Sequence, residues 1–462
     1  MSVVAAAPAA RVDNRLARIL ALRFNSIWAY TASQGPTFWA ILFYLFIEYV
    51  RPQSLFPAIS FIPWGEVSIG LAAITFLGTG HWFRAKSAIN WLLLLYLAVV
   101  LASSFQAYSF SDAREAWSLI FDWVIIYFLI SNIVTTPERF AVFLLTYLLY
   151  NFYMSQGAAR QWAGRGFSFA NWGVLGAPGW FRNSGEFGVE MCVFLPISWH
   201  FYLVARQYLS KWKKLFVLAM PVTALMGCVA SSSRGALVGA GGVLFWAVMR
   251  SKARFQALIG MPVLAAMLWL ITPQAQKERF TTAGQDSTSE RRLTYWKHGV
   301  EMLHDHPLLG VGYGNWSKYY FDHYVDQSVA IDYSFGEVQV SHNIFVECFA
   351  ELGYSGLIVL VLLIVWTFIA NFQTRKLARA GPDPPDLLIQ MAYGFDGALI
   401  GWIGSGFFVT VLYYPFLWIN LAFTVALNHI ARTRAARLRA ARAAPAAAAG
   451  RWNGAPAGGG RP

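Results

Sequence analysis

The chain has 462 residues, of which 57% are hydrophobic, 17% aromatic and only 13% charged. Soluble globular proteins carry about 25% charged residues, so the composition excludes an ordinary soluble protein and indicates a lipid bilayer as the solvent. The formal net charge of +13 does not indicate nucleic-acid binding, because most lysines and arginines stand in short clusters between apolar stretches, as topology signals do.

Residues 1–35 carry alanines, prolines and several arginines before the first long apolar run. They contain no short apolar core followed by a small-residue cleavage site, so we expect a retained cytoplasmic tail and not a signal peptide. At the other end, residues 431–462 are basic and then rich in alanine, glycine and proline, and we expect a disordered cytoplasmic tail.

Between these tails the sequence predicts an all-α polytopic membrane protein with about twelve transmembrane helices, since a spanning helix needs about 20 mostly apolar residues. Nine predicted spans fall within 36–272 and three within 342–430, which also holds a short interface helix. The spans lie near 36–50, 64–80, 89–105, 116–133, 138–155, 187–205, 214–231, 235–249, 256–272, 355–372, 387–409 and 411–430.

The basic clusters predict the orientation of these spans. If the N-terminus is cytoplasmic, every compact cluster falls on the cytoplasmic side, as the positive-inside rule requires. These clusters are Arg84 with Lys86, Arg139, Lys211 to Lys214, Arg250 to Arg254, Arg375 to Arg379, and the tail from Arg432. Three segments of interest then lie on the opposite, periplasmic side: residues 156–186, the turn 231–234, and a large loop, 273–341.

The large loop holds basic residues on the side that should be poor in them, among them Lys277, Arg279, Arg291, Arg292 and Lys297. A long loop partly escapes the rule, and the functional alternative is an anionic ligand on that side. Leu293, Trp296, Val300 and Leu303 recur at helical spacing and predict an amphipathic helix. Arg291 and Arg292 near its start oppose the helix dipole, which favours a bound anion there or a salt bridge with Glu290 or Asp286.

A glycine-rich turn containing Tyr313 follows His306-Pro307, and the sequence then reaches Ser341-His342-Asn343 and Glu347. Ser341 is a candidate cap for a helix that would begin at His342. An imidazole can act as a base near neutral pH, and a structural histidine at the membrane interface is the alternative.

Two further arginines are expected on the same side, Arg182 beside Asn183 and Glu186, and Arg234 after three serines. Either can simply extend its charge to the interface, but the guanidinium fork also suits phosphate. Several arginines, one candidate base and a membrane interface together favour a lipid diphosphate. No nucleotide-binding glycine motif is present, and no acidic pair stands out for a metal, so we expect no cofactor and arginines in the place of a metal.

These motifs resemble those of the O-antigen ligase and O-antigen polymerase superfamily. The resemblance is carried by Ser233-Arg234-Gly235, by Arg291 or Arg292 with Trp296 and the turn 306–312, and by His342-Asn343 followed by Gly353-Tyr354-Ser355-Gly356. The hexapeptide from Glu48 to Gln53 resembles the opening of a subgroup described as O-glycosylation ligases of exosortase-associated systems.

The resemblance implies a membrane-embedded glycosyltransferase with a type C-like fold in the bacterial inner membrane, which acts without a metal and inverts the sugar configuration. It implies undecaprenyl-diphosphate-linked glycan as the donor and an acceptor hydroxyl on lipid A-core, on a second glycan or on a protein. His342 would be the general base, and Arg234 with Arg291 or Arg292 would bind the diphosphate. Weaker substrate-binding candidates are Arg182, Asn183, Glu186, Asn343, Glu347 and Tyr313.

Two rival functions remain on the sequence alone. A polymerase or a protein O-glycan ligase would use the same donor. A transporter of the same lipid would carry charges or broken helices near the bilayer midplane, and Asp396 is the main residue of that kind.

Overall fold

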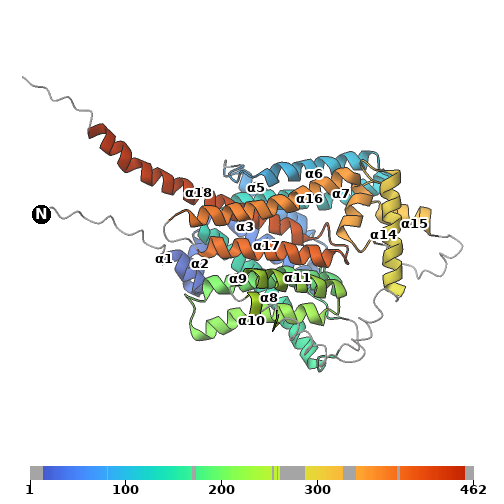
Figure 1. Ribbon diagram of the computed structural model, residues 1–462, viewed down its shortest axis with the longest axis horizontal. Coiled ribbons are helices and arrows are strands. Elements are labelled where there is room, and N and C mark those ends of the chain that lie inside the picture. Colours follow the sequence, from blue (N-terminus) through green and yellow to red (C-terminus); the bar gives the residue numbers. More distant parts are fainter. Residues whose placement is uncertain are drawn as a thin grey trace, which may run out of the picture.

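The computed structural model describes residues 14–80, 82–168, 173–251, 254–256, 259–260, 287–325, 340–381 and 386–452. Within these ranges every regular element is a helix, in agreement with the all-α prediction (Figure 1). The helices before residue 170 are α1 (Asn14–Leu20), α2 (Phe24–Ala32), α3 (Pro36–Tyr49), α4 (Pro52–Leu55), η1 (Pro57–Ile59), α5 (Trp64–Leu77), α6 (Ala88–Phe105), α7 (Phe110–Ile133) and α8 (Pro137–Gly164). Those after it are α9 (Ser184–Ala205), α10 (Lys211–Ala230), α11 (Arg234–Arg250), α14 (Ser287–Asp305), α15 (Trp316–Tyr324), α16 (Ile344–Arg379), α17 (Asp386–Gly406) and α18 (Pro415–Trp452).

Six of the described helices are long and apolar enough to cross a membrane: α6, α7, α9, α10, α16 and α17. The apolar helices α3 and α5 are shorter, and α8, α11 and α18 coincide with further predicted spans. The predicted span 256–272 lies almost entirely outside the described residues. The architecture therefore agrees with a multi-pass membrane protein, whereas the count of twelve stays a prediction.

Helix α9 lies at the centre of the bundle and contacts α8, α10, α11 and α17. Its most apolar stretch is 78% buried, against 33% for that of α6 at the periphery. Glycines allow the central backbones to approach: a Cβ on Gly239 of α11 would lie 2.7 Å from the carbonyl oxygen of Gly401, and one on Gly401 of α17 would lie 2.7 Å from that of Cys192. Small residues at helix crossings are how membrane helices gain close packing.

The basic clusters gather at the end of the bundle where both terminal segments lie (Figure 1). The ammonium of Lys213 donates to the carbonyl oxygen of Leu22 at 2.8 Å. Arg139 donates to the side chain of Gln34 at 2.8 Å, while Arg432 reaches the backbone of Lys86 at 3.1 Å. The contacts among these distant segments agree with the prediction that the clusters share one side.

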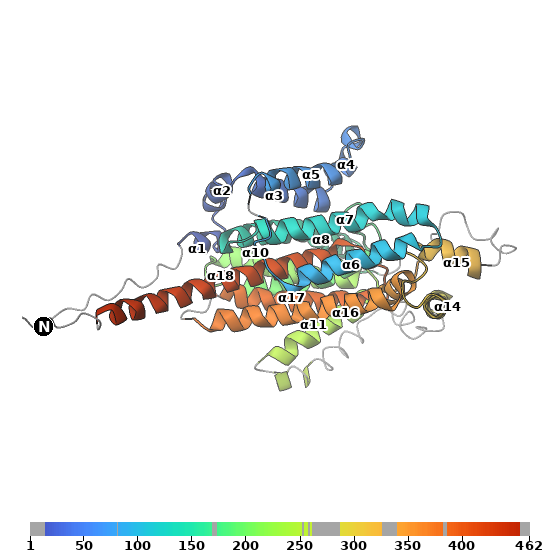
Figure 2. The ribbon, with the colours of Figure 1, turned by 90° about the horizontal axis from the view of Figure 1, so that it is seen from above.

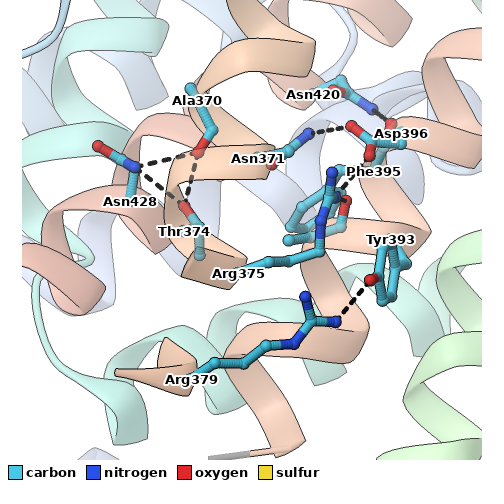
Figure 3. A network of polar contacts seen from close by, with 11 residues as sticks. Ala370, Asn371, Thr374, Arg375, Arg379, Tyr393, Phe395, Asp396, Asn420 and Asn428 are labelled. Carbon is cyan, nitrogen blue, oxygen red and sulfur yellow. Dashed lines mark hydrogen bonds and ion pairs between the residues drawn. The ribbon is translucent and has the colours of Figure 1, made fainter. Parts of the chain in front are cut away.

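One residue of a predicted basic cluster, Arg375, is buried inside the bundle and pairs with Asp396 (Figure 3). The guanidinium Nη1 lies 2.5 Å from the Asp396 carboxylate, whose other oxygen accepts from Asn371 at 2.9 Å. The guanidinium also lies 4.4 Å from the ring centroid of Tyr393. Asp396 is therefore paired with a buried arginine within a polar network that joins α16 and α17.

Helix α18 continues to Trp452, so residues 431–452 are helical where we expected disorder. The physical reason is composition: the segment is rich in alanine and arginine, and both residues have high helix propensity.

Candidate functional site

The predicted site residues lie at the end of the bundle that carries α14 and α15, which we call the loop end. Figure 1 shows α14 running across the ends of the long helices at this position, opposite the terminal segments. The loop end also contains the segments 173–183, 231–233, 310–315, 340–343 and 407–414 between neighbouring helices.

The glycine-rich turn 306–312 docks into a break in α16. Gly353 has φ 63° and ψ −162°, so the helix is kinked there, and backbone groups on both sides of the kink need other partners. Four backbone hydrogen bonds supply them: Val311 to Ala350 (2.8 Å), Gly312 to Glu351 (3.2 Å), Tyr354 to Pro307 (2.8 Å) and Ser355 to Leu308 (3.3 Å), each from N–H to carbonyl oxygen. The turn 306–312 and the motif 353–356, which are separate in the sequence, therefore form one hydrogen-bonded joint in the structure.

Helix α6 reinforces this joint from the side. The hydroxyl of Ser103 donates to the carbonyl oxygen of Glu351 at 2.8 Å, and the N–H of Tyr108 donates to that of Val311 at 2.9 Å. The loop end is thus held by backbone bonds from three separate parts of the chain.

His342 lies just before α16 in the left-handed region, with φ 51°. Its N–H donates to the hydroxyl of Thr410 at 2.8 Å, and its half-buried ring stacks on Tyr295 of α14 at a centroid distance of 6.3 Å. Burial, together with the positive charges of Arg292 and Arg291, lowers the pKa of His342 to about 4. The imidazole is therefore neutral at pH 7 and able to accept a proton.

The prediction that Ser341 caps a helix beginning at His342 is wrong. The left-handed backbone of His342 cannot belong to a right-handed helix, and α16 begins at Ile344. Asn343 is the cap: its side-chain oxygen accepts from the N–H groups of Phe345 (2.9 Å) and Val346 (3.3 Å). The Ser341 hydroxyl instead donates to the carbonyl oxygen of Asn343 at 3.1 Å, which braces the turn that holds the histidine.

The predicted amphipathic helix of the large loop is α14. Its packing distinguishes the two adjacent arginines, because only one of them lies on the buried face of the helix. Trp296 donates from Nε1 to the carbonyl oxygen of Ser341 at 3.1 Å, and Tyr295 of the same face stacks on His342. Arg292, one helical turn before these aromatic residues, is half-buried, whereas Arg291 is exposed. Arg292 is therefore the arginine on the face of α14 that packs against residues 340–343, which we call the histidine segment.

Arg234 is the first residue of α11, where the Ser233 hydroxyl caps the helix by accepting from the N–H of Ala236 at 3.3 Å. Its guanidinium Nη1 donates to the hydroxyl of Ser289 at 3.0 Å. Since Ser289 belongs to the first turns of α14, Arg234 lies beside the helix that carries Arg292. The structure thus brings arginines from two distant motifs to the same part of the loop end.

The three candidates near the start of α9 have different surroundings. Asn183 caps α9 by accepting from the N–H of Gly185 at 2.8 Å. Glu186 accepts from the hydroxyl of Tyr414 at 2.6 Å, which joins α9 to the segment 407–414. Arg182 is exposed at the loop end. The cap gives Asn183 a structural role, while Glu186 contacts the segment 407–414, which also binds the backbone of His342.

Tyr313 and Glu347 are both buried beneath the histidine segment. The ring of Tyr313 lies 5.0 Å from that of Tyr413, and burial raises its pKa far above the ordinary value, with Glu351 and Glu347 raising it further. Glu351, which the sequence analysis did not single out, accepts from the N–H of Trp316 at 3.2 Å. The spacing of four residues between Glu347 and Glu351 was the sequence signal that both carboxyl groups share one helix face.

Among the described residues, no group of three or more histidine, cysteine, aspartate or glutamate side chains is arranged to hold a metal ion. The charged groups beside His342 include Arg291 and Arg292, and a guanidinium suits an anionic ligand directly.

Comparison with known proteins finds similarity in the same part of the chain. Residues 219–361 match the family described as O-antigen ligase. A stretch of 114 residues is 28% identical to the exopolysaccharide production protein ExoQ of Rhizobium meliloti (strain 1021), covering 23% of this chain and 24% of that protein. The family match contains Arg234, Arg292 and His342. Residues 219–361 are therefore similar to the O-antigen ligase family, in agreement with the resemblance that the sequence motifs indicated.

Proposed function

We propose that this protein is a glycosyltransferase that moves a glycan from undecaprenyl diphosphate to an acceptor hydroxyl at the periplasmic face of the bacterial inner membrane. The observation that carries the proposal is the neutral imidazole of His342, which lies near Arg292 of α14, while Arg234 contacts the start of the same helix. In the proposed reaction the imidazole is the proton acceptor and the two guanidinium groups are the charges that bind phosphate.

In the proposed reaction the acceptor oxygen attacks the anomeric carbon of the donor sugar. A carbon–oxygen bond forms to the acceptor as the bond from that carbon to the diphosphate oxygen breaks, with inversion. His342 takes the hydroxyl proton as the bond forms. Arg234 and Arg292 bind the diphosphate and stabilise the charge that develops as it leaves, so the chemistry requires no divalent metal.

The acceptor that we propose first is lipid A-core. A second candidate, a polymerase that extends a lipid-linked glycan, is favoured by one specific observation: the relative is named for exopolysaccharide production. Transfer to a protein hydroxyl is the third possibility and rests on the hexapeptide from Glu48 to Gln53, which lies outside the matched residues.

The test uses purified protein in lipid vesicles with lipid-linked glycan and, in separate reactions, lipid A-core or no added acceptor. We expect His342→Ala to lose transfer by at least about 100-fold, the low end of the effect of general base catalysis. His304→Ala is the matched control because its side chain is 90% exposed, and it should transfer normally.

Transfer should also continue in the presence of EDTA. Near-normal transfer by His342→Ala, or a loss with EDTA that magnesium restores, would contradict the proposed mechanism. Product that forms only with lipid A-core identifies a ligase, and lengthened lipid-linked glycan without it identifies a polymerase.

A further inference from the structure

The loop end contains a cavity of about 370 Å³ that lies apart from the arginines and His342. Its walls come from the end of α3, the start of α5, the side of α7 and Trp180. Figure 2 shows α3 and α5 on one side of the bundle and α11, which begins with Arg234, on the other. The volume falls within the range of small-molecule sites, about 300–1,000 Å³.

The lining combines tryptophans with carboxyl groups. The tryptophans are Trp64, Trp123 and Trp180, the carboxyl groups are Glu48, Glu66 and Asp122, and Arg51, Gln53 and Ser118 complete the polar wall. Flat aromatic rings bury the apolar face of a pyranose ring, while carboxylates accept hydrogen bonds from its hydroxyl groups. Three carboxyl groups against one guanidinium make the cavity a poor site for a phosphate.

Two details show a wall that is built and held in place. Arg51 adopts a left-handed backbone conformation with φ 51°. Its guanidinium packs directly against Gly179, because a Cβ added to that glycine would lie only 2.1 Å from the Arg51 Cζ. That guanidinium lies 5.7 Å from the centroid of Trp180, whose Nε1 donates to Glu48.

The buried side-chain oxygen of Gln53 has no hydrogen-bond partner. An unpaired buried oxygen costs about 1–3 kcal/mol, so a hydroxyl donor entering the cavity is the natural partner. The cavity is thus shaped and polarised for a ligand rich in hydroxyl groups.

We propose that this cavity binds a neutral sugar ring of the acceptor glycan. The assignment to the acceptor rests on the proposed function, in which Arg234 and Arg292 bind the donor diphosphate. Helix α11, which begins with Arg234, and helices α3 and α5, which line the cavity, lie on opposite sides of the bundle, so the cavity is separate from the proposed diphosphate site.

The cavity and the histidine share the segment 407–414. Trp123 donates from Nε1 to the carbonyl oxygen of Tyr413 at 2.8 Å, and the ring of Trp180 lies 4.9 Å from that of Tyr414. The same segment binds the backbone of His342 through Thr410. A glycan held by the two tryptophans therefore lies against the segment that also positions the base.

The first experiment measures sugar binding without catalysis, by saturation-transfer-difference NMR on the full chain in a detergent without a sugar headgroup. The probes are the methyl glycosides of glucose, galactose, mannose and rhamnose. We expect transfer to at least one probe in the wild type and in His342→Ala. The signal should fall at least tenfold in Glu66→Gln, Asp122→Asn and Trp64→Leu, since a lost hydrogen bond to a charged group is about 1.5–3 kcal/mol.

The matched controls are Glu115→Gln, an exposed carboxylate of α7 outside the cavity, and Trp91→Leu, whose side chain is 75% exposed on α6. Both should bind as the wild type does. Absence of signal from every probe with the wild type, or unchanged signal in all three cavity variants, would overturn the proposal. Preferential binding of methylammonium over the glycosides would overturn it too, since it would identify a cation site.

The second experiment compares transfer kinetics in the same variants. We expect Glu66→Gln to raise the acceptor KM by about tenfold or more and to leave the donor KM unchanged; a raised donor KM overturns the assignment to the acceptor. If cavity variants lose sugar binding while the wild type shows no transfer, the sugar site stands and the proposed function fails. If transfer is normal in every cavity variant, the function stands and the sugar site fails.

Discussion

Substitution of Gly353 by alanine should destabilise the loop end by an amount that the structure allows us to work out. The backbone conformation of Gly353, with φ 63° and ψ −162°, is essentially restricted to glycine, and another residue there costs about 1–3 kcal/mol. A Cβ at this position would lie 2.4 Å from the carbonyl carbon of Leu308 and 2.6 Å from the carbonyl oxygen of Pro307. Both neighbours are backbone atoms, so no side chain can rotate away.

Moving that backbone breaks the hydrogen bonds from Tyr354 to Pro307 and from Ser355 to Leu308, at about 0.5–1.5 kcal/mol each. Together with the strain, the free energy of unfolding should fall by roughly 2–6 kcal/mol. The assay is unfolding of the detergent-solubilised protein by dodecyl sulfate, followed by circular dichroism.

The control is Gly241→Ala in α11, where a Cβ meets nothing within 4 Å. Alanine is favoured over glycine within a helix by about 0.8–1.0 kcal/mol, so this variant should be slightly more stable than the wild type. If Gly353→Ala unfolds within about 0.5 kcal/mol of the wild type, the joint between the turn 306–312 and the kink does not carry the stability that its geometry indicates.

Three further predictions concern the arginines, the histidine and the buried ion pair. Arg292→Ala should lower kcat/KM for transfer by about 100-fold or more, the scale of an electrostatic contact to the leaving group. Arg291→Ala should lower it by less than tenfold, because only Arg292 is on the buried face of α14. Equal losses in the two variants would contradict the assignment. The lowered pKa of His342, about 4, keeps the imidazole unprotonated above that pH. The value of kcat/KM should therefore stay level from pH 8 to pH 5 and fall only near pH 4. A fall centred near pH 6.5 would refute the lowered pKa of the histidine. Asp396→Ala should lower the free energy of unfolding by about 3–5 kcal/mol, because it leaves Arg375 buried without its carboxylate. The double variant with Arg375→Met should recover much of the loss. Equal stability of the single and double variants would exclude the ion pair as the cause.

The sequence predicted those parts of the fold that depend on local periodicity. The apolar spans of α6, α9 and α17 and the amphipathic helix α14 follow from composition and spacing over their own lengths. The gathering of basic clusters at one end and of Arg234 and His342 at the other followed from counting alternate connections.

Features that depend on contacts between distant segments could not be predicted in the same way. The adjacent arginines Arg291 and Arg292 are equivalent as sequence, and only the packing of α14 on the histidine segment separates them. The cap at Asn343 required knowledge that His342 is left-handed. Asp396 appeared as an isolated charge because its partner lies on another helix, at Arg375.

The left-handed conformation of His342 has a consequence for how this protein balances stability against activity. The left-handed conformation costs a residue with a Cβ about 1–2 kcal/mol, whereas glycine adopts it at almost no cost in free energy. A chain selected for stability alone would therefore carry glycine at this position. The backbone conformation of His342 therefore lowers the stability of the loop end, and the same backbone angle sets the direction in which the imidazole leaves the chain.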